Sequence, residues 1–268
     1  MSQQAATFRR MHGGPEPLRL PNAWDAGSAR LFESLGASAI ATTSAGVAWA
    51  QGYADGGKMP ADVAIAAAAS MARVLRVPLT VDMENGYSDD AKAVGETVRR
   101  LLDVGVAGIN IEDGTAAPGS LAAKIEAIKD AASKSGSDIF VNARTDVFLA
   151  NLVDASKRVD ETLSRGATYR AAGADGLFVP GLRDAAEIVA IVGGVGLPIN
   201  LMAWPGLAAS DELGRLGVRR LSAGSGISQM VWGQAERLAR DFLDTGRSES
   251  MAEGSMPYAQ LQSLFPGK

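Results

Sequence analysis

Residues 77–81, Val-Pro-Leu-Thr-Val, form an apolar run that leads directly into Asp82-Met83-Glu84-Asn85-Gly86-Tyr87. Alternate side chains of an extended strand share one face, so we expect Asp82 and Glu84 to point the same way and Met83 the opposite way. Two like charges at the end of a buried strand are unfavourable unless a cation lies between them. A plainer interpretation is a strand that runs out into a polar turn. On its own the stretch favours that interpretation, but the neighbouring segments shift the preference toward a functional site.

The rest of the chain repeats this pattern, a short apolar strand followed by a helix, about eight times. Each strand is preceded by Gly or Pro, and no linker or shift in composition divides the chain. Such alternation is typical of a parallel sheet with crossover helices, here an α/β fold closed into a (β/α)₈ TIM-type barrel. We predict one barrel domain over residues 1–268, with residues 246–268 as a C-terminal extension whose apolar residues need a neighbour. Strands are expected at 18–22, 39–42, 79–82, 105–111, 139–143, 176–179, 197–201 and 218–222, helices at 26–35, 60–75, 89–103, 121–134, 155–172, 185–192, 207–216 and 228–244, and a long loop at 43–57.

Composition narrows the function. The 268 residues are 47% hydrophobic and carry a formal charge of −4, which argues against nucleic acid or an anionic membrane as partner. Cysteine is absent, which excludes thiolate nucleophiles, disulfides and Cys-ligated metals. The single histidine, His12, lies in a Gly/Pro-flanked stretch near the N-terminus and is expected to be a solvated loop residue, which argues against a Ser–His–Asp triad. With no apolar signal core and no membrane-spanning run, we expect a soluble cytoplasmic protein.

Polar and charged side chains gather where the predicted strands end. Reacting groups of TIM-type barrels lie at the C-terminal strand ends. Acidic groups on neighbouring strands beside one arginine form an oxygen-ligand site suited to Mg²⁺, with Mn²⁺ as an alternative. The arginine would pair with a substrate carboxylate in bidentate fashion, and backbone N–H groups of the small-residue loop would bind the other anionic end. The residues are Asp82 and Glu84 on the third strand, Glu112 and Asp113 on the fourth, Arg144 and Asp146 on the fifth, and Thr43, Ser44, Ala45 and Gly46 on the second.

Each of these residues also has a plainer interpretation. Strand-end carboxylates are often solvated loop residues, and Arg144 with Asp146 would then be a surface pair worth little. Trp49 and Tyr53 would merely pack the loop. Asn200, a candidate substrate contact on a later strand, would only make a strand-end hydrogen bond. The joint occurrence of the set on consecutive strand ends favours the functional interpretation.

Five ordered motifs resemble the isocitrate lyase/phosphoenolpyruvate mutase superfamily and cover nearly the whole barrel. They are Pro21-Asn22-Ala23-Trp24-Asp25, Thr43-Ser44-Ala45-Gly46 with Gly52-Tyr53-Ala54-Asp55, Val81-Asp82-Met83-Glu84-Asn85-Gly86-Tyr87, Gly108-Ile109-Asn110-Ile111-Glu112-Asp113, and Asn142-Ala143-Arg144-Thr145-Asp146.

The resemblance implies roles for individual residues. Asp82 would bind Mg²⁺ directly, with Glu84 and Glu112 acting through metal-bound water. Arg144 would bind substrate, as would Thr43, Ser44 and Ala45. Asp55 would match the acid in the loop over the site, so the candidate catalytic residues are Arg144, Glu112 and Asp55. Members of the superfamily exchange a C-terminal helix between subunits, which implies a homo-oligomer, a dimer or a tetramer, and would account for the apolar tail.

Departures from the family pattern narrow the reaction. The isocitrate and methylisocitrate lyases have a Cys–Gly–His stretch after the Glu-Asp motif, whereas residues 114–121 here contain neither Cys nor His. A Lys–Thr–Asn-type segment of the phosphonate enzymes is also missing, and Pro180 stands where the mutase has a histidine. Glu84 gives an Asp-x-Glu version of the metal motif. The combination resembles the branch with short gating loops that acts on 2-oxo dicarboxylates, including oxaloacetate decarboxylase-like members.

We therefore predict a Mg²⁺-dependent carbon–carbon lyase that acts on a small 2-oxo or 2-hydroxy dicarboxylate through a metal-stabilised enolate, with oxaloacetate-type decarboxylation first. Three alternatives stay open. The first is a methylisocitrate- or isocitrate-type lyase that uses another acid, such as Tyr53 or Asp55. The second is a phosphonopyruvate hydrolase, and the third is a non-catalytic barrel that serves in binding or assembly.

Overall fold

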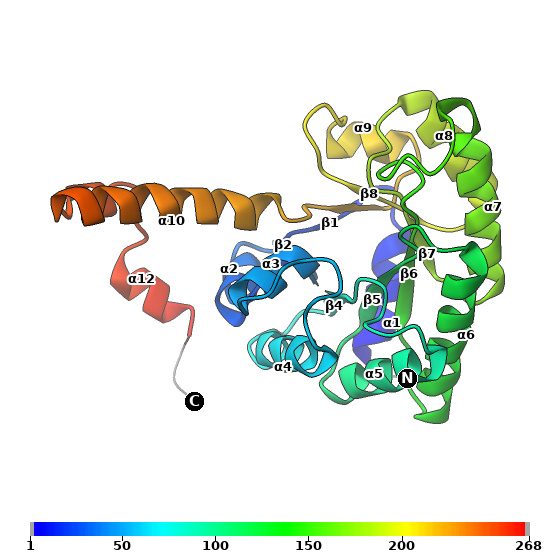
Figure 1. Ribbon diagram of the computed structural model, residues 1–268, viewed down its shortest axis with the longest axis horizontal. Coiled ribbons are helices and arrows are strands. Elements are labelled where there is room, and N and C mark those ends of the chain that lie inside the picture. Colours follow the sequence, from blue (N-terminus) through cyan, green and yellow to red (C-terminus); the bar gives the residue numbers. More distant parts are fainter. Residues whose placement is uncertain (1–2, 266–268) are drawn as a thin grey trace.

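The computed structural model describes residues 3–265 of the chain and shows a ring of parallel strands surrounded by helices (Figure 1). One sheet contains nine strands in the order β1-β9-β8-β7-β6-β5-β4-β3-β2. The two strands at the ends of this order, β1 (Leu18–Leu20) and β2 (Asn22–Ala23), are separated only by Pro21. They are the two halves of the first barrel strand. The first half, β1, pairs with β9 (Arg220–Ser222), and the second half, β2, pairs with β3 (Ile40–Thr42). These two pairings close the ring and confirm the predicted (β/α)₈ architecture.

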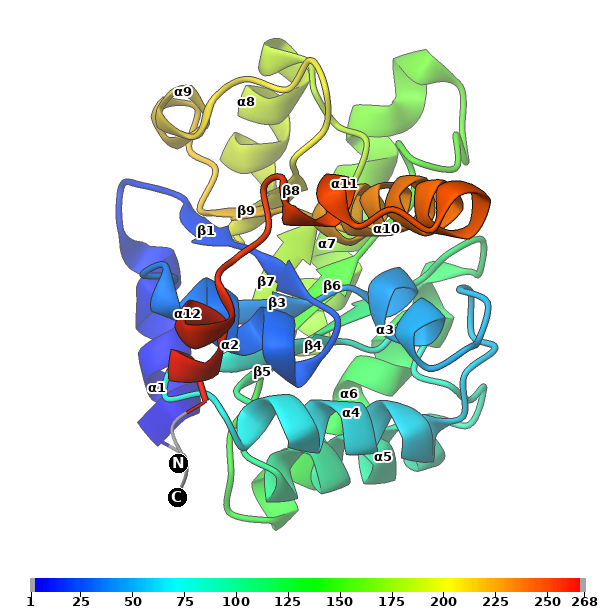
Figure 2. The same cartoon turned by 90° about the vertical axis from the view of Figure 1, so that its left-hand side faces the viewer.

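Strand and helix alternate around the ring as the sequence predicted, except that the last helix, predicted at 228–244, extends away from the barrel (Figure 1). Each predicted strand and helix is present, with ends displaced by no more than three residues. Helices α8 and α9 lie on one side of the barrel and α4 and α5 on the opposite side (Figure 2). The remaining strands are β4 (Leu79–Asp82), β5 (Gly108–Glu112), β6 (Phe140–Arg144), β7 (Gly176–Phe178) and β8 (Ile199–Met202); the outer helices are α2 (Ala26–Ser34), α4 (Ala61–Ala72), α5 (Ala91–Asp103), α6 (Pro118–Lys134), α7 (Arg158–Ala171) with the short η2 (Ala155–Lys157) before it, α8 (Ala185–Val195) and α9 (Ser210–Arg215).

The loop predicted over residues 43–57 is wrong in its first half, where α3 (Ser44–Ala50) forms. Thr43 precedes the helix in extended conformation, and its Oγ1 accepts a hydrogen bond from Gly46 N at 3.4 Å. A Cβ on Gly46 would lie 2.6 Å from the Thr43 side chain and 2.9 Å from Trp24, so only glycine fits there. An alanine-rich stretch behind a threonine cap is thus enough to start a helix.

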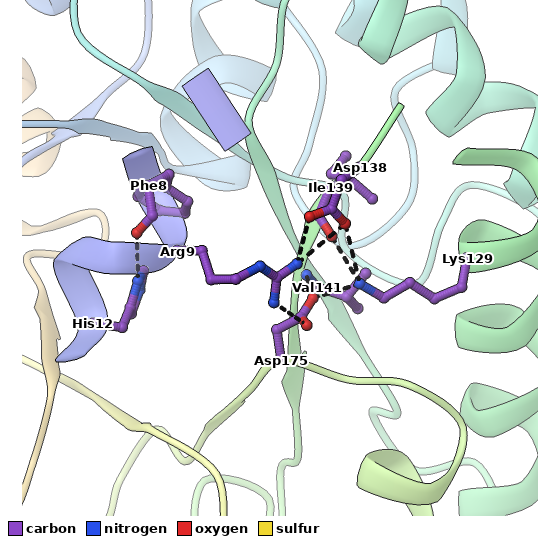
Figure 3. A network of polar contacts seen from close by, with 8 residues as sticks. All are labelled: Phe8, Arg9, His12, Lys129, Asp138, Ile139, Val141 and Asp175. Atoms are coloured by element: carbon purple, nitrogen blue, oxygen red, sulfur yellow. Dashed lines mark hydrogen bonds and ion pairs between the residues drawn. The ribbon is translucent and has the colours of Figure 1, made fainter. Parts of the chain in front are cut away.

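The prediction that His12 is a solvated loop residue is also wrong. Helix α1 (Gln3–Arg10) and the 3₁₀ turn η1 (Met11–Gly13) place His12 at the N-terminal end of the barrel, with 4% of its surface exposed. Its Nδ1 lies 2.9 Å from the carbonyl oxygen of Phe8 (Figure 3), and its ring stacks on Phe140 at 4.1 Å between centroids. Flanking glycine and proline suggested a loop, but contacts with distant aromatic residues decide its burial.

Helix α10 (Gly226–Thr245) extends away from the barrel (Figure 1) and is followed by α11 (Glu249–Ala252) and α12 (Tyr258–Ser263). The end of α12 returns to α2, where Arg30 Nε donates to Leu264 O at 2.9 Å. Exposed apolar side chains on α10 include Met230, Val231, Trp232 and Leu243. A largely apolar cleft of about 500 Å³ lies between β1, α2 and Ile227 at the start of α10. No helix among the described residues is long and apolar enough to span a membrane.

Candidate active site

Asp82 and Glu84 lie at the C-terminal end of β4, but the strand reaches only Asp82. Glu84 has a φ of 51°, in the left-handed region, so the alternation of an extended strand does not extend to it. The turn begins early because Gly86 N donates to the Met83 carbonyl at 2.8 Å. Asp82 Oδ1 accepts from Glu84 N at 3.3 Å, which keeps the two acids adjacent. The predicted pair is therefore present, but a turn rather than the strand positions Glu84.

Glu84 is almost fully buried, with 3% of its surface exposed. One oxygen, Oε2, accepts a hydrogen bond from the backbone N–H of Gly57 in the loop that follows α3. The other, Oε1, has no hydrogen-bond partner among the described residues. A buried carboxylate oxygen without a partner is unfavourable, which indicates a missing donor or cation at this position.

Arg144 and Glu112 face each other across the neighbouring strands β5 and β6, where they are paired in register. Arg144 Nη1 lies 2.7 Å from Glu112 Oε2. The opposite edge of the guanidinium donates two bonds to Asp146, from Nε at 2.7 Å and from Nη2 at 3.0 Å. No more than 20% of any of these three side chains is exposed, so the interpretation of Arg144 and Asp146 as a surface pair is wrong. Asp146 therefore occupies the Nε–Nη2 edge of the Arg144 guanidinium, and Glu112 contacts its Nη1 end.

Asp113 is buried against α7, where its carboxylate has three donors. Oδ2 accepts from Arg165 Nη1 at 2.9 Å and from the Tyr169 hydroxyl at 2.5 Å, and Oδ1 accepts from Asp146 N at 3.1 Å. Its side chain is 0% exposed. Sequence reasoning grouped Asp113 with the strand-end acids and missed Arg165 and Tyr169, although their spacing of four residues on a helix places them on one face.

The loop residues predicted to bind substrate follow β3 at the same end of the barrel. Thr43, Ala45 and Gly46 are buried and Ser44 is half-buried. Ser44 and Asp82 line one small internal cavity. Asp55, in the loop after α3, is exposed. Substrate contacts by these residues stay a prediction.

Asn200 lies inside the barrel, 1% exposed. Its Oδ1 accepts from Asn142 Nδ2 at 3.0 Å, and its Nδ2 donates to Leu201 O at 2.6 Å and Ser222 Oγ at 3.2 Å. The same interior network contains Arg220, which sequence reasoning missed and which donates from Nη2 to Asn110 at 3.0 Å. This geometry matches the plainer interpretation of Asn200 as a strand hydrogen-bonder, and its substrate contact stays a prediction.

Five carboxylates at this end of the barrel repel one another. Burial raises the pKa of Asp82, and Asp55 raises it as well, while Arg144 and the amides of Glu84 and Ser44 lower it. Burial raises the pKa of Glu112 to about 8; Arg144 lowers it, and the charges of Asp82, Asp146 and Glu84 raise it. Burial also raises the pKa of Glu84, which Gly57 lowers and Asp55 and Asp82 raise. Shifts in this direction identify a place where a cation is favoured.

The donor set fits a hard divalent cation. Among residues 3–265 no three His, Asp or Glu side chains converge into a ready-made metal cage. Mg²⁺ does not require one, because it binds through one or two carboxylates and keeps several waters or substrate oxygens. Asp82, Glu84 and Glu112 present oxygen ligands only, and Glu84 Oε1 is free to accept. A cleft of about 290 Å³ opens onto Glu84 and Glu112, between residues 56–57 and the connection 113–116.

A closed parallel barrel with acidic groups and an anchored arginine at its C-terminal strand ends has the arrangement that is typical of (β/α)₈ enzymes. Residues 8–243 match the family model described as phosphoenolpyruvate phosphomutase. The chain belongs to this family and is an enzyme of the isocitrate lyase/phosphoenolpyruvate mutase superfamily, a group of lyases and mutases, which confirms the resemblance of the five motifs.

Relatives of the chain agree with this assignment. Protein Rv1998c of Mycobacterium tuberculosis (strain ATCC 25618 / H37Rv) is 38% identical over 262 residues, 96% of this chain and 95% of the relative. An oxaloacetate decarboxylase of Ectopseudomonas mendocina (strain ymp) is 34% identical over 160 residues, 57% of this chain and 54% of that enzyme. A crystal structure of a proposed phosphonomutase from Burkholderia cenocepacia J2315 superposes with a TM-score of 0.84 and 39% identity, over 89% of this chain and 99% of that one.

Proposed function

We propose that the protein is a Mg²⁺-dependent carbon–carbon lyase that decarboxylates a small 2-oxo dicarboxylate of the oxaloacetate type. The observation that carries this proposal is the site itself: Arg144 anchored between Glu112 and Asp146, beside the half-buried Asp82 and the buried Glu84. The similarity to an oxaloacetate decarboxylase supports the same reaction.

The connection between β5 and α6 favours decarboxylation over cleavage that needs a positioned acid. It spans only residues 113–117, and it contains neither cysteine nor histidine. Loss of CO₂ breaks the bond between C3 and C4 of the substrate and sends the electron pair toward the C2 oxygen as an enolate. No base is needed to begin this step, and water can supply the proton that C3 then takes. A short loop with neither cysteine nor histidine as proton donor is therefore sufficient.

The chain's own residues bind and orient the acid. Arg144 Nη1 points toward Glu112 and can donate to the substrate's C1 carboxylate or to the developing enolate oxygen, in a largely buried setting that strengthens the interaction. Thr43, Ser44 and Gly46 present small side chains and backbone to the other end of the substrate. Asp82, Glu84 and Glu112 would hold Mg²⁺ or Mn²⁺. Bound there, the ion supplies Lewis-acid stabilisation of negative charge on the keto oxygen.

A panel of 2-oxo and 2-hydroxy acids, assayed with Mg²⁺, tests the proposal. We expect turnover of oxaloacetate to pyruvate above the rate with free Mg²⁺ alone, and loss of that excess in Arg144→Ala and Glu112→Ala. Arg183→Ala, an exposed arginine that donates only to Pro205 O at 3.5 Å, is the control. Glyoxylate or pyruvate from a substituted malate or methylisocitrate would instead favour a lyase with its own acid, and phosphate from phosphonopyruvate would favour the hydrolase. No turnover of any acid would contradict catalysis.

We also propose that the chain forms a homo-oligomer. Apolar side chains along α10, among them Val231 and Leu243, are exposed, with 49% and 81% of their surfaces accessible. Burial of such a surface is strongly favourable in water. Light scattering in solution measures the mass, and a monomer at micromolar concentration would contradict the proposal.

A further inference from the structure

The guanidinium of Arg144 owes its orientation to Asp146. Two parallel hydrogen bonds, Nε to Oδ1 at 2.7 Å and Nη2 to Oδ2 at 3.0 Å, fix the plane of the group. Such bidentate pairs are geometrically specific as well as strong. Whatever holds Asp146 in place therefore determines where Arg144 Nη1 points.

Asp113 holds the segment that contains both residues. Its backbone N–H donates to the carbonyl of Arg144 at 3.2 Å, and its Oδ1 accepts from the backbone N–H of Asp146 at 3.1 Å. One residue of the β5 strand end thus brackets residues 144–146 at the β6 strand end from two sides. A displacement of Asp113 must displace the Arg144 segment as well.

The outer helix α7 in turn holds Asp113. Tyr169 donates its hydroxyl proton to Asp113 Oδ2 at 2.5 Å, and Arg165 Nη1 donates to the same oxygen at 2.9 Å. Arg165 is itself fixed by Glu161, which accepts from its Nε at 2.7 Å. Tyr169 is 0% exposed and Arg165 8% exposed, so water does not compete for these bonds.

We propose that Tyr169 and Arg165 are positioning residues for Arg144. They act through Asp113 and then Asp146, and neither touches the substrate. This inference rests on the proposed function in so far as Arg144 is the residue that binds the 2-oxo acid. A purely structural role, in which the same contacts only pack α7 against the barrel, predicts a lower stability without any specific effect on Arg144.

The first test measures Arg144 directly and needs no substrate. The Nε–Hε cross-peak of Arg144 is assigned in a ¹H–¹⁵N spectrum by its loss in Arg144→Lys. Tyr169→Phe removes one hydroxyl and keeps the packed ring. We expect this variant to shift and broaden the cross-peak, and we expect the control Tyr258→Phe, on exposed α12, to leave it unchanged. An unmoved peak in Tyr169→Phe overturns the proposal.

The second test is a double-mutant cycle on kcat/KM for the acid that the wild type turns over. In the wild-type background Tyr169→Phe should lower kcat/KM about 10-fold, the scale of a lost hydrogen bond to a charged group. In the Arg144→Lys background, where the bidentate pair with Asp146 is already lost, the same change should lower it less than about 2-fold. Equal factors in both backgrounds overturn the proposal.

Two features keep the outcomes separable. Should Tyr169→Phe fail to fold, Arg165→Lys replaces it, because a lysine keeps the charge next to Asp113 but loses the fork that joins Asp113 to Glu161. If the wild type turns over none of the acids, the proposed function fails while the Arg144 cross-peak still decides the positioning role.

Discussion

The two ends of the barrel arrange their charged groups in opposite ways. At the N-terminal end Arg9 and Lys129 meet Asp138 and Asp175, and each charge has a partner (Figure 3). Asp175 Oδ2 also accepts from Val141 N at 2.8 Å. At the C-terminal end several carboxylates share one cation, Arg144. Paired charges stabilise the fold, whereas an acidic excess lowers stability until a cation arrives.

The largest effect expected from this comparison concerns Asp82. Asp82→Asn should lower kcat/KM by about 10³, because Lewis-acid stabilisation of a developing anion amounts to several kcal/mol. Without metal the variant should be at least as stable as the wild type, since one repulsive charge is gone. Steady-state kinetics with Mg²⁺ measure the change in kcat/KM, and thermal unfolding without metal measures the change in stability.

Mg²⁺ should raise the unfolding midpoint of the wild type but not of Asp82→Asn. It should also raise the midpoint of the control Asp89→Asn, because Asp89 is an exposed acid at the rim of the cleft that Glu84 and Glu112 line. An equal rise in all three proteins would remove Asp82 from the metal site.

The opposite end should respond in the opposite sense. Asp175→Ala leaves Arg9 and Lys129 without one partner each and removes the acceptor of Val141 N. We expect the free energy of unfolding to fall by about 2–3 kcal/mol, below the full value for a buried pair because Arg9 is partly exposed, with kcat/KM unchanged. Denaturant titration measures the loss. As control, Asp211→Ala breaks an exposed pair with Arg215 and should change stability by less than about 0.5 kcal/mol. A loss of turnover in Asp175→Ala would show that the two ends are coupled.

The smallest effect is a pH dependence that belongs to the N-terminal end. Burial lowers the pKa of His12 to about 3; Arg220 and Arg9 lower it too, while the Phe8 carbonyl raises it. A histidine with a depressed pKa contributes full stability above its unfolded value and loses it as pH falls. Between pH 7 and pH 5 the free energy of unfolding should fall by about 2 kcal/mol from this group.

The matched variant is His12→Phe, which keeps an aromatic ring on Phe140 and cannot titrate. The difference in unfolding free energy between the two proteins should change by the same amount between pH 7 and pH 5. Because His12 is the chain's only histidine, a single imidazole resonance also reports the titration directly. A resonance that titrates near 6.5 would contradict its burial.

Sequence reasoning predicts best what depends on local pattern. Alternating strands and helices define the barrel, and parallel strands bring their carboxyl ends to one edge, so Asp82, Glu112 and Arg144 meet as expected. Features set by distant residues escaped prediction. His12 is buried by Phe140, and Asp113 is drawn to α7 by Tyr169. Neither has a signal in its own segment.

The division of the first barrel strand at Pro21 has a consequence for folding. Leu18 is in register with Arg220, so the backbone groups on one edge of β1 form their hydrogen bonds with the last strand, β9. On a ribosome that edge stays open until nearly the entire chain has emerged. Contacts between such distant positions are slow to establish, because a long loop must be closed before they bring any gain. We therefore expect closure of the barrel to be the late, rate-limiting step in the folding of this enzyme.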